Sequence, residues 1–281
     1  MSPASHAAEG SLGSFANVDT ADPADLVHRL DAMHMLEFFR AYKHETFGLL
    51  GLAPGDRVAD VGCGTGDDAR NLAAIVGAAG TAVGFDLSDS MLAEARSRHA
   101  GAQKNLRFIR AAADDLGVEA AAFDAIRADR VLTHVPDPAA AIREMVRALK
   151  PGGRIVVSEP DMPGCWATSN NHAISEKILR SIAMSCQQPY AARDLYHLFL
   201  DAGIGEVQLA LRPVAISDPE PVENILRFAA TAEAMVGNGE LGKAEAGRWH
   251  ADFEERRRRG RFLAGMTMFI VAGRKPGGPT G

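Results

Sequence analysis

The sequence has few of the residues that would build a metal centre or a disulfide framework. Its three cysteines, Cys63, Cys165 and Cys186, lie far apart and form no C-x-x-C pair. Such scattered cysteines are typical of reduced thiols in a cytoplasmic protein rather than of zinc ligands or bridged pairs. We therefore expect neither a metal site nor a disulfide.

Long apolar runs and a basic excess are also missing. No stretch of 18 or more apolar residues occurs, and no basic and then apolar segment opens the chain. We therefore expect no membrane span, no export signal and a cytoplasmic location. Lys and Arg number 30 against 36 Asp and Glu, a formal net charge of -6. Because nucleic-acid-binding proteins usually have a basic excess, this balance argues against such a partner.

Strand and helix patterns alternate across the first 160 residues. A small, polar segment at 1–18 is expected to be disordered, and residues 22–52 then show helical periodicity. Strands are predicted at 57–62, 81–86, 106–111, 124–129 and 151–160, with helices at 67–76, 90–99 and 138–149. This alternation predicts an α/β, Rossmann-like, doubly wound sheet of seven mostly parallel strands with helices on both faces.

The pattern changes after residue 160. Helices are predicted at 169–189, 192–204, 221–236 and 241–259, and strands at 206–216 and 261–275. No linker is long enough to separate independent domains, so we expect a single domain over residues 19–274 and a tail at 275–281. The helical insertions at about 161–189 and 218–260 are expected to form a lid over a cleft, or a homodimer element.

The segment "VADVGCGTGDDARNLA", residues 58–73, places glycines at every second position from 62 to 66, between a strand and a helix. Glycines there permit positive φ angles and let a ligand contact the backbone. The dinucleotide motif G-x-G-x-x-G requires its third glycine where this chain has Asp67. Asp60, Asp67 and Asp68 would also repel a pyrophosphate and attract a cationic ligand. A sulfonium-containing nucleoside, S-adenosylmethionine, meets that requirement.

Asp86 in "AVGFDLSDSML" supports a nucleoside ligand. It ends the next predicted strand, 20 residues after Gly66. A carboxylate at this point can accept hydrogen bonds from both ribose hydroxyls. The same spacing occurs in nicotinamide-binding folds, and a helix N-cap is the structural alternative.

Four segments together resemble class I S-adenosylmethionine-dependent methyltransferases, closest to the small-molecule enzymes of the ubiquinone/menaquinone C-methyltransferase type. They are "VADVGCGTGDD", "AVGFDLSDSML", "FDAIRADRVLTHVPDP" and "ALKPGGRIVVSEP". The resemblance implies that S-adenosyl-L-methionine is the cofactor and that the ribose is held by Asp86. The residues that it implies for cofactor binding are Asp60, Gly62, Gly64, Gly66, Asp86, Leu87, Met91, Ala113, Asp114, Asp129 and Arg130.

Methyl transfer needs proximity and exclusion of water more than strong acid–base catalysis. A base is required only for an acceptor that arrives protonated, such as a phenol. Strand ends and insertions flank the expected cleft, so Asp161 and His172 are our catalytic candidates, with Glu159 as a further carboxylate. His134 is interpreted as mainly structural. Methionine and aromatic side chains in the insertions are expected either to pack against the sheet or to line a pocket for a hydrophobic or aromatic metabolite.

We therefore predict methylation of a small molecule, on a C, N or O atom, of the kind used in natural-product biosynthesis. A cofactor-binding protein that catalyses another reaction, such as cyclisation, is the alternative on the same fold. A nicotinamide dehydrogenase is disfavoured by Asp67. A nucleic-acid methyltransferase is disfavoured by the charge and by the lack of an Asn/Asp-Pro-Pro-aromatic motif.

Overall fold

The structure is a computed structural model that describes residues 18–20, 22–101 and 103–277. The segment predicted to be disordered lies outside these residues except for Val18. That residue is buried and begins the 3-10 turn η2 (Val18–Thr20).

One mixed sheet forms the centre of the molecule, in the order β3-β2-β1-β4-β5-β8-β6, with β7 paired to β8. The first five strands of this order are parallel to one another. The last strand, β8, runs antiparallel to β5 on one side and to β7 on the other. The seven expected strands are β1 (Arg57–Val61), β2 (Thr81–Asp86), β3 (Leu106–Arg110), β4 (Phe123–Asp129), β5 (Leu149–Pro160), β7 (Gly205–Ile216) and β8 (Ala264–Arg274). The two-residue strand β6 (Trp166–Ala167) pairs with β8 and was not predicted.

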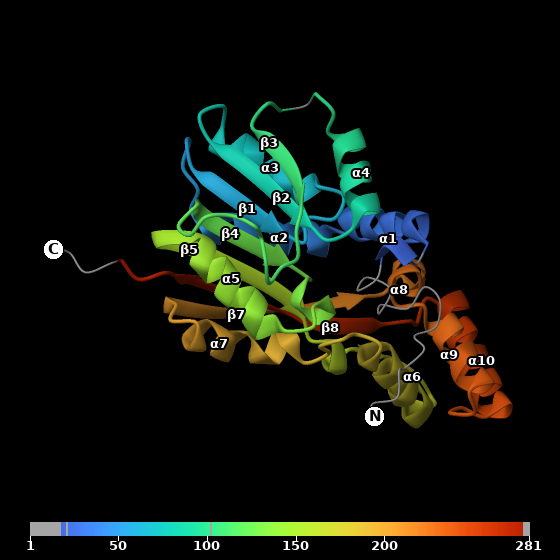
Figure 1. The fold of residues 1–281 in the computed structure, drawn as a ribbon. Helices are drawn as coiled ribbons and strands as arrows, with labels where there is room; N and C mark the ends of the chain where they lie inside the picture. Colours follow the sequence, from blue (N-terminus) through green and yellow to red (C-terminus); the bar gives the residue numbers. More distant parts are fainter. Residues whose placement is uncertain (1–17, 21, 102, 278–281) are drawn as a thin grey trace.

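Helices cover both faces of this sheet, which confirms the predicted α/β class (Figure 1). One face packs against α5 (Pro138–Ala148) and α7 (Ala191–Asp201). The other packs against α2 (Glu37–Leu50) and α3 (Asp67–Val76), while α4 (Asp89–Arg98) lies beside β2 and β3.

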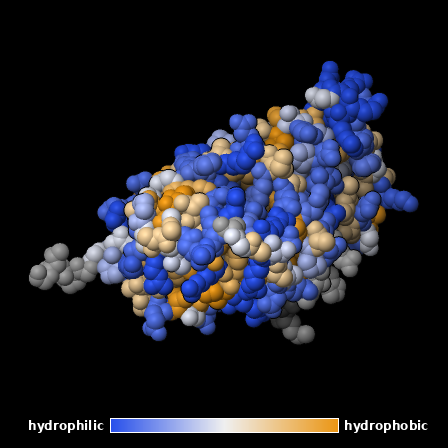
Figure 2. All heavy atoms as spheres, turned by 90° about the horizontal axis from the view of Figure 1, so that it is seen from above, coloured by the Kyte–Doolittle hydropathy of each residue, from blue (hydrophilic) through white to orange (hydrophobic). Residues whose placement is uncertain are grey.

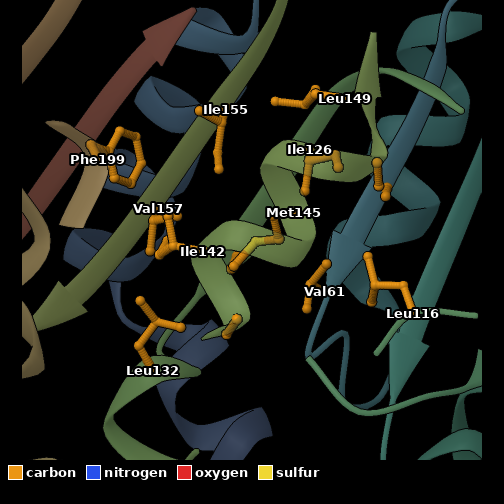
Figure 3. Close-up of a cluster of buried hydrophobic side chains, with 14 of the residues drawn as sticks. Val61, Leu116, Ile126, Leu132, Ile142, Met145, Leu149, Ile155, Val157 and Phe199 are labelled. Atoms are coloured by element: carbon orange, nitrogen blue, oxygen red, sulfur yellow. The ribbon is translucent and has the colours of Figure 1, made fainter. Parts of the chain in front are cut away.

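The contact between α5 and the sheet shows how the core is built. Figure 3 shows Ile142 and Met145 of α5 lying over Ile126 of β4 and Val157 of β5. All four side chains have an exposed fraction of 0%. Full burial of such a side chain contributes about 1.5–3 kcal/mol. The apolar residues of α5 recur at helical spacing, so the sequence alone predicts this face.

A helical cap lies at one end of the sheet, on the right of Figure 1. The cap comprises α1 (Pro23–Met35), the turn η4 (Met162–Gly164), α6 (His172–Met184), α8 (Pro219–Leu226), α9 (Phe228–Gly237) and α10 (Lys243–Arg258). Its later helices have an apolar core of their own, in which Ile178, Phe228 and Trp249 are buried. These helices therefore stabilise one another as well as covering the sheet.

Two expected helices are each divided in the structure. The periodic segment 22–52 forms α1 and α2, separated at Leu36, whose ψ is 128°. The helix predicted at 221–236 breaks at Arg227, which has a φ of 55° and separates α8 from α9. An ion pair of 2.7 Å joins Arg227 to Asp25 of α1. Apolar periodicity continues through both breaks, so it could not reveal them.

On the face in Figure 2, apolar atoms form separate patches between hydrophilic ones. Among the described helices, none combines the length and the apolar character that crossing a membrane requires. The three cysteines are all described and all free, with Cys63 and Cys186 buried.

Candidate active site

The glycine turn that joins β1 to α3 has the predicted backbone. Gly62, Gly64 and Gly66 have φ values of 70°, 51° and 80°. A Cβ at Gly62 would lie 2.3 Å from Cγ2 of Val131, so no other residue fits there without movement. A Cβ at Gly66 would lie 2.6 Å from the ring of Phe108. Gly66 is therefore required for packing between α3 and β3.

A cavity of about 580 Å³ opens beside this turn, at the carboxyl ends of β1, β2 and β4. Ligands in open α/β sheets bind at this edge, and the volume is in the usual range for small-molecule sites. Of the residues that the family resemblance implied for cofactor binding, all except Gly66 line the cavity. The structure thus brings together side chains from four separate loops.

Asp86 lies at the edge of the glycine turn. One carboxylate oxygen accepts a hydrogen bond of 2.8 Å from the backbone N–H of Gly64, and the other accepts one of 2.9 Å from Ser88. Burial raises the pKa of Asp86 above its usual value. The N-cap of α4 is Ser88, which accepts from the N–H of Met91. Each oxygen of Asp86 keeps a second lone pair for a ligand hydroxyl.

Asp19 is a cavity residue that the sequence did not reveal. It lies in η2 and accepts hydrogen bonds from the hydroxyls of Ser88 and Ser90 and from the N–H of Asp89. Hydrogen bonds from Ser90 and Ser88 are the main reason that the pKa of Asp19 lies below its usual value. The segment before α1 is therefore held against the start of α4, where Leu87 and Met91 line the cavity.

A buried ion cluster lies beneath the cavity. The side chain of Arg127 is 1% exposed, and its Nη1 lies 3.0 Å from Asp60 and 3.1 Å from Asp68. Its Nη2 lies 3.3 Å from Asp129. Lys43 of α2 donates a hydrogen bond of 2.7 Å to Asp68. The sequence marked Asp60, Asp68 and Asp129 of this cluster, but no pattern pointed to Arg127 or Lys43 as their partners.

The ion pairs of this cluster change the charge that was expected near the glycine turn. Burial raises the pKa of Asp60 to about 7, although Arg127 opposes the rise. For Asp68, burial is outweighed by Arg127 and Lys43, so its pKa is lowered. Two of the three aspartates near the turn are therefore neutralised inside the protein. Both line the cavity, but their ion pairs with Arg127 and Lys43 leave little net negative charge to attract a cationic ligand.

Asp67 belongs to a group that could hold a metal ion, together with Asp31 and His34. Cationic side chains already contact this group, because Arg98 hydrogen-bonds to Asp31 at 2.7 Å and Lys43 lies 2.8 Å from Nε2 of His34. A further cation would be repelled here, so the group is better explained as part of the ion-pair network.

Part of the cavity lining is apolar. It is formed by side chains from α1, α2, η4, α8 and β8, namely Met33, Phe39, Met162, Ile225, Leu226 and Met266. His134 also lines the cavity. Burial and the charges of Arg130 and Arg29 lower the pKa of His134 to about 4, so its imidazole is neutral at pH 7.

The predicted catalytic residues lie away from this cavity. Asp161 accepts two hydrogen bonds from Arg193, at 2.7 and 3.1 Å, and does not line the cavity although both its neighbours do. His172 begins α6 and lines a separate cavity of about 480 Å³. Glu159 is fully buried and accepts hydrogen bonds from the N–H groups of Val131 and Leu132. Burial raises the pKa of Glu159 to about 7.

Comparisons with known proteins identify the fold family. Residues 52–206 match a family model described as a methyltransferase domain. The chain belongs to this methyltransferase family. It is 31% identical, over 88% of its length and 70% of the relative's, to an uncharacterized 37.1 kDa protein in transposon TN4556 of Streptomyces fradiae. A ubiquinone/menaquinone biosynthesis C-methyltransferase of Ectopseudomonas mendocina is 41% identical over 44% of this chain, a match that spans 50% of that enzyme.

Solved structures share the fold. Phosphoethanolamine N-methyltransferase 2 of Haemonchus contortus, in complex with S-adenosyl-L-methionine, superposes with a TM-score of 0.60 at 16% identity, covering 94% of this methyltransferase and 60% of that chain. The YcgJ protein of Bacillus subtilis gives 0.59 at 18% identity, covering 84% and 100%.

The cofactor of this methyltransferase is S-adenosylmethionine. The residues present fit that group: the glycine backbone permits close approach, and Asp86 retains hydrogen-bonding capacity for a ribose. The apolar residues of the cavity lining remain available for contact with a methyl acceptor.

Proposed function

We propose that this methyltransferase transfers the methyl group of S-adenosylmethionine to a small hydrophobic or aromatic metabolite. The observation that carries the proposal is that one cavity is lined both by the glycine turn with its aspartates and by methionine, isoleucine, leucine and phenylalanine side chains. An apolar wall with a few polar groups is typical of small-molecule sites.

When bound, S-adenosylmethionine would supply an electrophilic methyl group to a nucleophilic C, N or O atom of the acceptor, with S-adenosylhomocysteine as the leaving group. The chain's residues position the two reactants and exclude water. The glycine turn and Asp86 would hold the cofactor, with Leu87, Met91, Ala113 and Asp114 beside its adenosine part. Phe39 of α2 and Met162 of η4 would contact the acceptor.

The cap would close this cavity. Arg29 of α1 is buried and donates a hydrogen bond of 2.8 Å to the carbonyl of Ile225 in α8. The Asp25–Arg227 pair joins the same two segments. These contacts connect the N-terminal helix to the insertion at 218–260, which supports the proposal that both form a lid.

No candidate base among Asp161, His172 and Glu159 lines the cavity. We propose that an acceptor which must lose a proton releases it to solvent, because the His134 imidazole, with a pKa of about 4, is a weak base. Proximity would then provide most of the rate enhancement, as expected for transfer from a sulfonium.

Methyl transfer can be tested with methyl-labelled S-adenosylmethionine and a set of phenols, aromatic acids and amines. We expect label to enter an organic-extractable product, and calorimetry to show binding of S-adenosylhomocysteine but not of NAD. The matched control is Gly64→Val, which places a side chain at a residue with a φ of 51°. Tight binding of S-adenosylhomocysteine without transfer to any acceptor would favour the non-methylating alternative.

A further inference from the structure

Arg130 is the most unusual residue of the cavity. It follows β4 directly and is one of four described non-glycine residues with a positive φ, at 59°. Such conformations are unfavourable for a residue with a Cβ and cluster at functional sites. Its side chain lines the cavity and is 14% exposed.

The Arg130 guanidinium contacts two apolar side chains that line the cavity. Its central carbon lies 5.3 Å from the ring centre of Phe39, and its Nη1 lies 2.6 Å from Sδ of Met33. Its Nε is buried and has no hydrogen-bond partner among the described residues. A guanidinium has five N–H donors in a rigid plane, so most of this hydrogen-bonding capacity is unused.

Asp129, the nearest carboxylate, is already engaged by other groups. It accepts hydrogen bonds from Tyr42, at 3.0 and 3.2 Å, and from Ser158, at 2.5 Å. Arg127 lies 3.3 Å away, whereas Nε of Arg130 lies 3.5 Å from the same oxygen. Asp129 would therefore remain well compensated without Arg130.

The net charge of the cluster also favours an anionic ligand beside Arg130. The carboxylates of Asp60, Asp68 and Asp129 stand against three cations, Arg127, Lys43 and Arg130. Arg127 lies within 3.3 Å of all three carboxylates, and Lys43 pairs with Asp68 and Asp129. Because the pKa of Asp60 is raised to about 7 by burial, the cluster is neutral when Asp60 is ionised and carries a partial positive charge near pH 7. Among the described residues, the buried donors of these cations that have no hydrogen-bond partner are Nε of Arg130 and Nη2 of Arg127. Arg130 has the more exposed side chain of the two, at 14% against 1%.

We propose that Arg130 binds an anionic oxygen, a carboxylate or phenolate, on a flat acceptor that packs beside Phe39. This inference rests on the proposed function, because it assigns the acceptor's chemical class at the same cavity. It differs from the role implied by family resemblance, in which Arg130 contacts the methionine part of the cofactor. A bidentate contact with guanidinium would select an anion and fix its orientation.

The test compares 2-naphthoate with 2-naphthamide, and benzoate with benzamide, as ligands of the protein saturated with S-adenosylhomocysteine. Calorimetry on the wild type should show each carboxylate binding at least 10-fold more tightly than its amide. Arg130→Gln should reduce this ratio to less than threefold, and Arg130→Lys, which keeps the charge without the planar donors, should give an intermediate ratio. The affinity for S-adenosylhomocysteine should stay within threefold in both variants.

Arg110→Gln is the matched control, because Arg110 is a cation at the rim of the same cavity and pairs with Asp89 at 3.2 Å. That variant should keep the wild-type ratio. Equal binding of acid and amide to the wild type, including no binding of either, would overturn the proposal. So would a loss of S-adenosylhomocysteine affinity in Arg130→Gln with an unchanged ratio. Failure of the proposed function would appear separately, as absence of methyl transfer or of cofactor binding.

Discussion

The two sides of the cavity come from different kinds of sequence. The cofactor side consists of short loops at the ends of parallel strands, where the glycine turn and Asp86 line the cavity. The acceptor side is assembled from α1, α2, η4, α8 and β8, which are spread over more than 230 residues of the chain. A parallel sheet fixes the first side by its topology, whereas the second depends on how the cap packs. The acceptor side can therefore change while cofactor binding is retained.

Arg127 pairs with three buried carboxylates of the cluster, so its loss should have the largest effect. Arg127→Met leaves Asp60, Asp68 and Asp129 without their shared cation, and we expect a loss of about 3–5 kcal/mol in the free energy of unfolding. Guanidinium-induced unfolding measures this loss. The matched control is Lys150→Met, which breaks a partly exposed pair with Asp124 at 2.7 Å and should cost about 1 kcal/mol or less. Equal losses for the two variants would contradict the buried cluster.

Asp86→Ala tests the cofactor side alone. Because it removes a carboxylate proposed to hold the ribose, affinity for S-adenosylhomocysteine should fall by about 1–3 kcal/mol. Binding of an aromatic acid to the acceptor side should change little. Asp89→Ala, three residues further on and 73% exposed, provides the control. Unchanged cofactor affinity in Asp86→Ala would show that Asp86 serves only to hold the turn.

Substitution of His134, which lines the cavity, changes the pH dependence of the free energy of unfolding. We expect this effect to be the smallest of the three. The pKa of His134 is lowered by burial to about 4, so between pH 4 and the ordinary value near 6.5 the unfolded chain binds more protons than the folded one. Its stabilising effect is therefore complete above pH 6.5 and lost as pH falls towards 4. Since His134 is partly exposed to the cavity, we expect this contribution to be about 1–2 kcal/mol.

Unfolding of wild type and His134→Asn across pH 4–7 measures the effect as the difference between the two curves. The variant's curve should be flatter over that range. Parallel curves would mean that the imidazole titrates normally in the folded protein.

The sheet and the cofactor side were predictable because their signals are local. Gly62 and Gly64 need positive φ angles, and a strand followed by glycines and a helix can be recognised within one short segment. The doubly wound order then follows from the alternation of strands and helices. Contacts between distant segments could not be predicted in this way, because the neighbouring sequence does not specify them.

Lys43 illustrates that limit. It occurs in an ordinary amphipathic helix, and only the folded chain shows its ammonium against Asp68 and His34. Asp161 is the opposite case, in which the local sequence suggests a catalytic role that the folded structure does not favour. The end of β5 is a favourable place for a catalytic carboxylate, but Arg193 of α7 pairs with it. Whether Asp161 or His172 takes part in the reaction stays a prediction, which the geometry does not favour.

The position of β8 between β5 and β7 has a consequence for synthesis on the ribosome. The backbone groups of β5 that face β8 have no partner until residues 264–274 have emerged, about 100 residues after β5 itself. The glycine turn can form early, but the wall that contains Met266 is completed last. A nascent chain would therefore acquire its nucleoside pocket before it could distinguish one methyl acceptor from another.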